Sequence, residues 1–479
     1  MSAVASKVEY ETVIGLEIHV QLATRTKMFC GCETSFGDEP NTHVCPRCLG
    51  LPGSLPLPNA KAVHFGLMIG LALGCELAPR SIFHRKNYFY PDLPKGYQIS
   101  QFDEPLCAGG QLAEVRVHRV HLEEDAAKLN HAGGAGRIQG SDASVVDFNR
   151  GGTPLAEIVT EPDLRSAEQA STWLRLLRTT LRQLGVSDVN MEEGSLRCDA
   201  NISIRPIGQQ QFGTKTELKN MNSFRFIERG IRAEVARQTA ILDSGGEVTQ
   251  ETLHFDPKTE SISSMRSKEE AHDYRYFPEP DLIPVQITSA MIDAAKAELP
   301  ELPLERQARL EGIGVDSGAA RQLSWRPELG DLFEASLQAD GAHPKQLANL
   351  ICNELVARLG DGELSDSKAE PAQIARLVAL VQDGKVTGAG ARTVLDTLVP
   401  KGGETDAIVA SEGLEAMGGG DELTGIVQKA LDANPDVVEK LRGGDMKPIG
   451  VIVGFVMRET KGRADGGEVT KVARGLLGL

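Results

Sequence analysis

Apolar and polar residues alternate along residues 13–22, which is the pattern of a β-strand with one buried face. One face of this predicted strand is apolar, whereas the other carries Glu17, His19 and Gln21. A carboxylate and an imidazole two residues apart can bind one cation or act as an acid–base pair. A strand whose polar face simply meets water has the same pattern, so the strand alone leaves both interpretations open.

The alternation recurs at residues 196–205, where the polar positions are Arg197, Asp199, Asn201, Ser203 and Arg205. Two amphipathic helices are predicted among the strands, one from an N-cap at Ser166 to about residue 184 and one after Ser223. From residue 302 onward the apolar positions recur every three or four residues, with helix starts at Pro344 and Pro371. The pattern therefore predicts an α+β chain with three parts, residues 1–295, 296–405 and 406–479.

The composition is that of a water-soluble globular protein of 479 residues with a net charge of −16. No apolar run approaches 18 residues and no leader segment is visible, so we expect a cytoplasmic protein without a membrane span. The acidic balance argues against diffuse affinity for nucleic acid, and we expect no DNA partner. The segment from Lys440 onward nevertheless holds eight basic and four acidic residues. This end either faces a polyanion or is a solvated helical face.

Four of the eight cysteines form two close pairs, Cys30 with Cys32 and Cys45 with Cys48. Two such pairs a short distance apart can arrange four thiolates tetrahedrally around one zinc ion. Four protein ligands leave no open coordination position, so the predicted zinc site is structural. Four unligated cysteines are the alternative.

Carboxylates recur where predicted strands end, notably Glu124 and Glu157. Glu157 lies in an apolar setting, where an unpartnered charge is costly. A divalent cation shared by Glu17, His19, Glu124 and Glu157 would remove that cost, and such a set favours magnesium or manganese.

Residues 84–98 mix basic residues with three of the six tyrosines of the chain. Cations that meet phosphate oxygens and rings that stack on bases would make this a nucleotide-binding segment. An aromatic loop packed on the sheet is the other interpretation. Lys215 and Lys219 add two lysines on one strand face, and the sequence has no P-loop motif.

Several long motifs, in one order along nearly the whole chain, resemble the GatB family, the B subunits of aspartyl/glutamyl-tRNA amidotransferases. They occupy residues 10–20, 85–92, 98–102, 123–126, 152–155, 191–199 and 273–281. The resemblance implies a cradle-shaped catalytic domain, then a helical domain and a helical tail domain that bind tRNA. The zinc-binding insertion in the catalytic domain rests on the cysteine spacing, because only part of the family has it.

The resemblance also implies a two-step reaction. The side-chain carboxylate of Glu-tRNA(Gln) or Asp-tRNA(Asn) takes the γ-phosphoryl group of ATP, and ammonia from a partner amidase subunit then displaces the phosphate. It implies a heterotrimer in which this chain joins the amidase subunit with a small third subunit. It also matches Glu17, His19, Glu124 and Glu157 to cation and active-site positions, and in this picture Lys86 is the candidate for a phosphate contact. It does not distinguish between the two tRNA substrates.

Two other functions remain open at this level: a zinc-stabilised tRNA-binding adaptor without its own chemistry, and a carboxylate–amine ligase that needs no tRNA. One departure from the family pattern occurs after Lys461, where Asp465 is followed by two glycines instead of Asn-Pro. Asp465 can still cap a helix, but without proline at the first position we expect a looser start.

Overall fold

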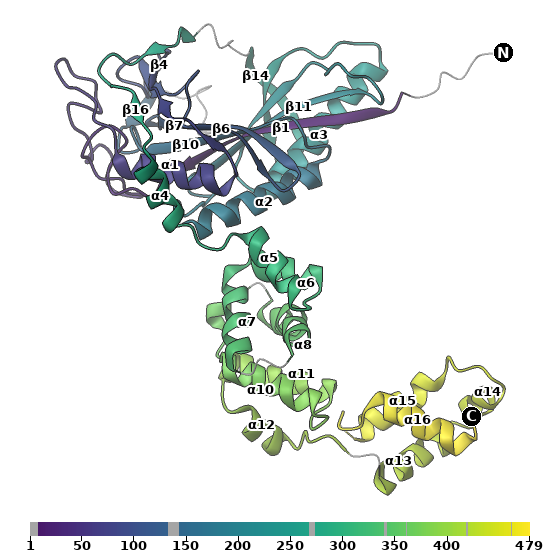
Figure 1. Ribbon diagram of the computed structural model, residues 1–479. Helices are drawn as coiled ribbons and strands as arrows, with labels where there is room; N and C mark the ends of the chain where they lie inside the picture. Colours follow the sequence, from purple (N-terminus) through teal and green to yellow (C-terminus); the bar gives the residue numbers. More distant parts are fainter. Residues whose placement is uncertain are drawn as a thin grey trace, which may run out of the picture. The chain divides into compact units, whose positions relative to one another are not determined.

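The computed structural model describes residues 8–132, 143–267, 274–339, 343–360, 362–417, 420–460 and 462–479. Asp273 of the last matched motif and Lys461 lie outside these residues. The chain divides into two compact units, Met1–Leu302 and Pro303–Leu479, and each is described by itself. The first contains a large sheet and the second is helical, so the predicted α+β class is confirmed (Figure 1).

A nine-stranded sheet organises the first unit, in the order β14-β13-β12-β11-β1-β10-β7-β6-β2. The predicted first strand is β1, which lies at its centre between β10 and β11. The strands, in sheet order, are Ser261–Ser267, Glu251–Asp256, Thr216–Met221, Leu196–Pro206, Tyr10–Gln21, Pro154–Thr160, Val115–Glu124, Cys107–Leu112 and Glu76–Leu77. Neighbouring strands run antiparallel except β12 and β13, which are parallel.

Three helices, α1 (Ala60–Ala72), α2 (Ala167–Gln183) and α3 (Phe224–Asp243), pack on one face of this sheet (Figure 1). The predicted caps are present, because Ser166 accepts from the amide of Gln169 and Ser223 from that of Phe226. Ile18 and Val20 of β1 are fully buried beneath the helices. The opposite face of the central strands is therefore the one that carries Glu17 and His19.

Shorter strands complete the first unit and give the small sheets β15-β4-β5, β16-β3 and β8-β9. Their bounds are Arg80–Ser81 (β3), His84–Asn87 (β4), Tyr97–Ser100 (β5), Lys128–Ala132 (β8), Ala143–Asp147 (β9), Phe277–Pro278 (β15) and Val285–Gln286 (β16). Strand β4 contains Lys86, and the helix α4 (Ser289–Ala297) packs on α1.

The second unit consists of helices, as the three-to-four-residue spacing of its apolar positions predicts. They are α5 (Pro303–Gly312), α6 (Ser317–Trp325), α7 (Pro327–Ala339), α8 (Pro344–Asn349), a π-helical turn (Leu350–Leu355), α9 (Val356–Leu359), a 3₁₀ turn (Leu364–Asp366), α10 (Pro371–Gln382), α11 (Gly388–Lys401), α12 (Thr405–Glu412), α13 (Asp421–Asp432), α14 (Pro435–Arg442), α15 (Ile449–Glu459) and α16 (Gly466–Leu477). None of the described helices is long and apolar enough to cross a membrane.

Buried apolar residues of this unit form two clusters, one from Leu310 to Leu414 and one from Leu423 to Ala473. Ile408 and Val409 of α12 belong to the first cluster, so the packing changes after residue 414 and not at the expected boundary near 405. The division into a helical domain and a tail domain stays a prediction. At the start of α16, the Asp465 side chain accepts from the amides of Gly467 and Glu468, so the helix is capped without proline.

Candidate active site

Strand register places polar side chains in a row across the centre of the sheet. His19 of β1 lies opposite Glu157 of β10 on one side and Arg197 of β11 on the other, and Glu157 lies opposite His121 of β7. Directly opposed residues in antiparallel strands point to the same face. The pleat and register of the strands alone therefore place four side chains in one row: His121, Glu157, His19 and Arg197.

Two imidazoles and three carboxylates converge around this row, and we call Glu17, His19, His121, Glu123 and Glu157 the acidic cluster. The Nε2 atom of His19 lies 3.3 Å from a carboxylate oxygen of Glu157, 3.6 Å from Glu123 and 3.9 Å from Glu17. The Nε2 atom of His121 lies 3.4 Å from Glu157 and 3.6 Å from Glu123. Glu157 and Glu123 are each shared by both imidazoles, and Glu157 is the nearer of the two carboxylates to both.

Glu124 does not join these residues, and Glu123 takes the place that we expected for it. Consecutive residues of a strand point to opposite faces, so Glu123 and Glu124 of β7 cannot both face the cluster. The Glu124 carboxylate instead pairs with Lys95 and accepts from the amide of Ile99 at 2.9 Å. Of the four expected residues, the structure brings together Glu17, His19 and Glu157.

The electrostatics of the acidic cluster show that it requires positive charge. Burial alone would lower the pKa of His19, but Glu157, Glu123 and Glu17 outweigh it and raise the pKa to about 9. Burial is outweighed in the same way at His121, where Glu157 and Glu123 raise the pKa to about 9. Without a cation, protons on the two imidazoles offset part of the negative charge of the three carboxylates, and a bound metal ion would supply positive charge in their place.

The donor set fits a hard divalent cation. Magnesium and manganese bind their ligands at about 2.1 Å, which places neighbouring ligand atoms about 3 Å apart. Ligand atoms of Glu17, His19 and Glu157 lie within 4.8 Å of one another, as do those of His121, Glu123 and Glu157. Small side-chain rotations would close either set around an ion, and carboxylate oxygens are the donors that such cations prefer.

A cavity of about 950 Å³ opens above the acidic cluster and is lined by further charged side chains. Lys86 lines it, with its ammonium group 4.8 Å from the ring centre of Tyr274. Burial would lower the pKa of Lys86, but the neighbouring Tyr276, Glu123 and Glu157 outweigh it and raise the pKa. Among the described residues no carboxylate lies within 4.0 Å of Lys86, so its charge faces the cavity without an ion-pair partner.

Two other cations in the cavity are paired with acids. Arg197 donates to the buried carboxylate of Asp125 at 2.9 Å, and Lys219 donates to Asp199 at 2.5 Å. Sequence reasoning placed Arg197 and Asp199 on a polar strand face but gave them no partner. The fold supplies both partners, because Asp125 directly follows the end of β7 and Lys219 lies on β12, the strand that pairs with β11.

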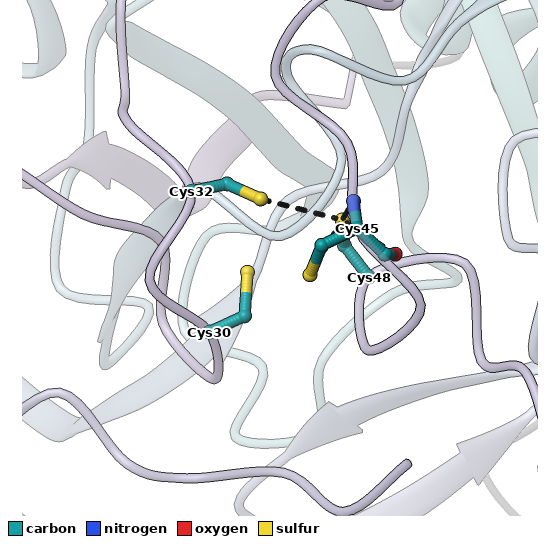
Figure 2. Close-up of side chains that lie close together, drawn as sticks. All are labelled: Cys30, Cys32, Cys45 and Cys48. Carbon is teal, nitrogen blue, oxygen red and sulfur yellow. Dashed lines mark hydrogen bonds between the residues drawn. The ribbon is translucent and has the colours of Figure 1, made fainter.

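The four paired cysteines form a second, separate site, and Figure 2 shows their sulfur atoms pointing toward one another. All four lie within 4.8 Å of each other, with Cys48 4.0 Å from Cys32 and 3.7 Å from Cys45. Four sulfurs bound tetrahedrally to zinc at about 2.3 Å would be about 3.8 Å apart. The residues therefore fit a zinc ion without rearrangement of the loop.

Family models match both parts of the chain. Residues 12–293 match the GatB/GatE catalytic domain, and residues 331–477 match the GatB domain. A protein of Frankia casuarinae described as the B subunit of an aspartyl/glutamyl-tRNA(Asn/Gln) amidotransferase is 50% identical to this chain, with 98% of this chain and 96% of that protein covered. Proteins of the same description from Persephonella marina and Brevibacillus brevis are 46% identical over 98% of this chain and nearly all of their own length.

The chain belongs to the GatB family. The resemblance inferred from the motifs is therefore confirmed over both units, and the catalytic-domain match spans the acidic cluster, the cavity and the cysteine site.

Two residues of the acidic cluster in this GatB-family chain, His121 and Glu123, were missed by sequence reasoning. The sequence does place His121 and Glu123 two residues apart in β7, so their side chains point to the same face. Once β7 is paired with β10, that face is the one of Glu157. Choosing Glu124 over Glu123 required the register of β7 against β10, which the sequence of β7 alone does not contain.

Proposed function

We propose that this GatB-family chain activates the side-chain carboxylate of Glu-tRNA(Gln), Asp-tRNA(Asn) or both with ATP and then forms the amide with supplied ammonia. In the first step a carboxylate oxygen attacks the γ-phosphorus of ATP and ADP leaves. In the second, ammonia attacks the acyl phosphate and inorganic phosphate leaves. The convergence of the acidic cluster at the floor of a cavity with an unpaired lysine is the observation that carries the proposal.

The residues of the site have separable roles in this reaction. Glu17, His19, Glu123 and Glu157 would hold the divalent cation, which when bound neutralises charge on the phosphoryl group. Lys86 contacts a phosphate oxygen, since no carboxylate of the described residues competes for its charge. Glu124 pairs with Lys95 on the other face of β7 and orders the segment at Ile99.

The chain works in a complex, because nothing in its described residues resembles the nucleophile of an amidase. We propose as partners an amidase subunit that releases ammonia from glutamine, a small third subunit, and misacylated tRNA as the substrate. The exposed basic residues of the tail, such as Lys440, Lys447 and Lys471, suit phosphate contacts with tRNA. Misacylated tRNA exists where translation occurs, which places the proposed activity in the cytoplasm.

Cys30, Cys32, Cys45 and Cys48 would hold zinc as a structural ion. Their sulfur spacing leaves no room for a fifth ligand or a substrate, so the zinc has no part in the chemistry.

Release of phosphate from ATP labelled with ³²P at the γ-position separates this function from its alternatives. The complex of this chain with its amidase partner should release labelled phosphate only when misacylated tRNA is present. An adaptor without chemistry releases none with any tRNA, and a tRNA-independent ligase releases it without tRNA. Either of those results contradicts the proposal.

A further inference from the structure

Lys27 lies three residues before the first cysteine of the zinc site, and its side chain is fully buried. Only 1% of the residue is exposed to solvent, which makes it one of the largest fully buried side chains of the described chain. Its ammonium group donates to the carbonyl of His43 at 2.8 Å and to that of Phe148 at 3.0 Å. Burial of a lysine charge is costly unless an opposite charge compensates it.

No carboxylate supplies that compensation. Among the residues that the structure describes, no Asp or Glu oxygen lies within 4.0 Å of the Lys27 ammonium group, and both hydrogen-bond partners are neutral carbonyls. Glu124, the acidic residue of β7 that lines the same cavity, is engaged by Lys95. The buried charge therefore needs another counter-charge.

The cysteine site is next to it. Lys27, Cys30 and Cys48 line one small cavity of about 60 Å³, and the amide of Lys27 donates to the carbonyl of Cys32 at 3.0 Å. One of the two carbonyls that Lys27 holds belongs to His43, two residues before Cys45. Zinc bound by four thiolates carries a net charge of about −2, which is the counter-charge that Lys27 lacks.

We propose that Lys27 is the buried counter-charge of the zinc–tetrathiolate centre, and that the stability of each depends on the other. Zinc binding compensates the lysine charge, and the lysine charge stabilises the negatively charged zinc–thiolate centre. Because Lys27 also holds Phe148, the same contact fixes the segment that leads into β10, the strand of Glu157. The inference concerns metal binding and does not rest on the proposed transamidation.

The test compares zinc binding and thermal unfolding of the full chain with Lys27→Met, which keeps the length of the side chain and removes the charge. Zinc affinity is measured by competition with a chromophoric chelator. We expect affinity to fall by about ten- to one-hundredfold, the size typical of lost support around metal ligands. Arg47→Met removes a charge from an exposed position of the same loop, and it should change affinity much less because water screens that charge.

Unfolding with and without zinc separates the charge from the two hydrogen bonds. Lys27→Met should lower the unfolding temperature of the zinc-loaded chain and leave that of the metal-free chain unchanged or higher. An equal decrease in the unfolding temperature of the zinc-loaded and the metal-free chain would show that Lys27 acts through its hydrogen bonds alone, and would overturn the proposal. So would unchanged zinc affinity, or a wild-type chain that binds no zinc.

If Lys27→Met does not fold even with zinc, Lys27→Arg and Lys27→Gln replace it. Arginine keeps the charge, whereas glutamine keeps a donor without the charge. The proposal requires tighter zinc binding by the arginine variant, and the opposite order contradicts it.

Discussion

At the scale of single residues, the site depends on which side chains of β7 point to the face of the acidic cluster. Glu17 and His19 were recognisable from the sequence as a carboxylate and an imidazole on one strand face, and Glu157 as a charge in an apolar setting, with most of the support from the family resemblance. The choice between Glu123 and Glu124 was not, because both are buried carboxylates and differ only in the face to which they point. Only the pairing of β7 with β10 decides it.

Glu123→Gln and Glu124→Gln test this assignment as a matched pair. Glu123→Gln should weaken binding of Mn²⁺ at least about tenfold, because it removes a charged donor from the acidic cluster. Glu124→Gln should leave Mn²⁺ binding near the wild-type value. Electron paramagnetic resonance of free Mn²⁺ measures both, with Glu76→Gln in the exposed strand β2 as the control. The reverse order would show that the sequence-based choice of Glu124 was right.

Lys86→Met tests the phosphate contact. Loss of a preorganised positive charge at the transferring phosphoryl group should lower kcat/KM for ATP by about 100-fold. Mn²⁺ binding should survive, because Lys86 is not a ligand. Steady-state kinetics of the amidotransferase complex measure the effect, and Lys61→Met on the exposed face of α1 is the control. Full activity of Lys86→Met would exclude the contact.

At the scale of elements, the helix α3 shows where pattern reasoning stops. Its start at Ser223 and its buried Ile227 and Ile231 follow from capping and period. The same period places Val235 on the buried face of the next turn, but Val235 is only half-buried and this turn buries Glu234 and Gln238 completely. The Glu234 carboxylate accepts from Thr216 of β12 and from Gln238, both at 2.8 Å. A buried polar group of this kind requires a partner on another element, which helix periodicity does not encode.

Glu234→Leu should therefore destabilise the first unit although leucine suits a buried helix position. The change removes the nearest acceptor of Thr216 and Gln238 and the nearest ion-pair partner of Arg237, at a cost of about 1–3 kcal/mol in the free energy of unfolding. Urea denaturation measures the cost, and Glu247→Leu at an exposed position should change little. An equally stable Glu234→Leu variant would show that the network contributes nothing to stability.

At the scale of the whole chain, composition and period were enough to separate the sheet unit from the helical unit. The predicted change at 295/296 lies close to the observed division after Leu302. The order of strands could not be predicted, because β1 pairs with β10 and β11, which lie far away in the sequence. The acidic cluster is built by those long-range pairings.

Ion pairs between segments that lie apart in the sequence make the chain sensitive to acid. Arg116 of β7 with Asp163, just after β10, is a case in which the direction of the effect is defined. Two hydrogen bonds from the Arg116 guanidinium, at 2.6 and 2.9 Å, lower the pKa of Asp163 in the folded chain. The unfolded chain then binds more protons, so this stability is complete above the ordinary carboxyl pKa of 3.8 and is lost as pH falls through the lower folded pKa.

Asp163→Asn should accordingly flatten the dependence of unfolding free energy on pH below about pH 5. The effect is small, because Arg116 is largely exposed and solvent screens the pair. Urea denaturation at a series of pH values measures it, beside the exposed carboxyl variant Asp436→Asn. Parallel curves for wild type and Asp163→Asn would contradict the assignment.

The central claim, that the acidic cluster holds the cation of phosphoryl transfer, is tested most directly by diffraction. Crystals of the chain with Mn²⁺ and a non-hydrolysable ATP analogue would locate the ion by its anomalous signal. We predict an ion bound by Glu157 together with His19, Glu17 or Glu123, with the γ-phosphate between the ion and Lys86. The claim would be contradicted if the ion and the nucleotide were bound elsewhere while the carboxylates of the acidic cluster still paired with His19 and His121.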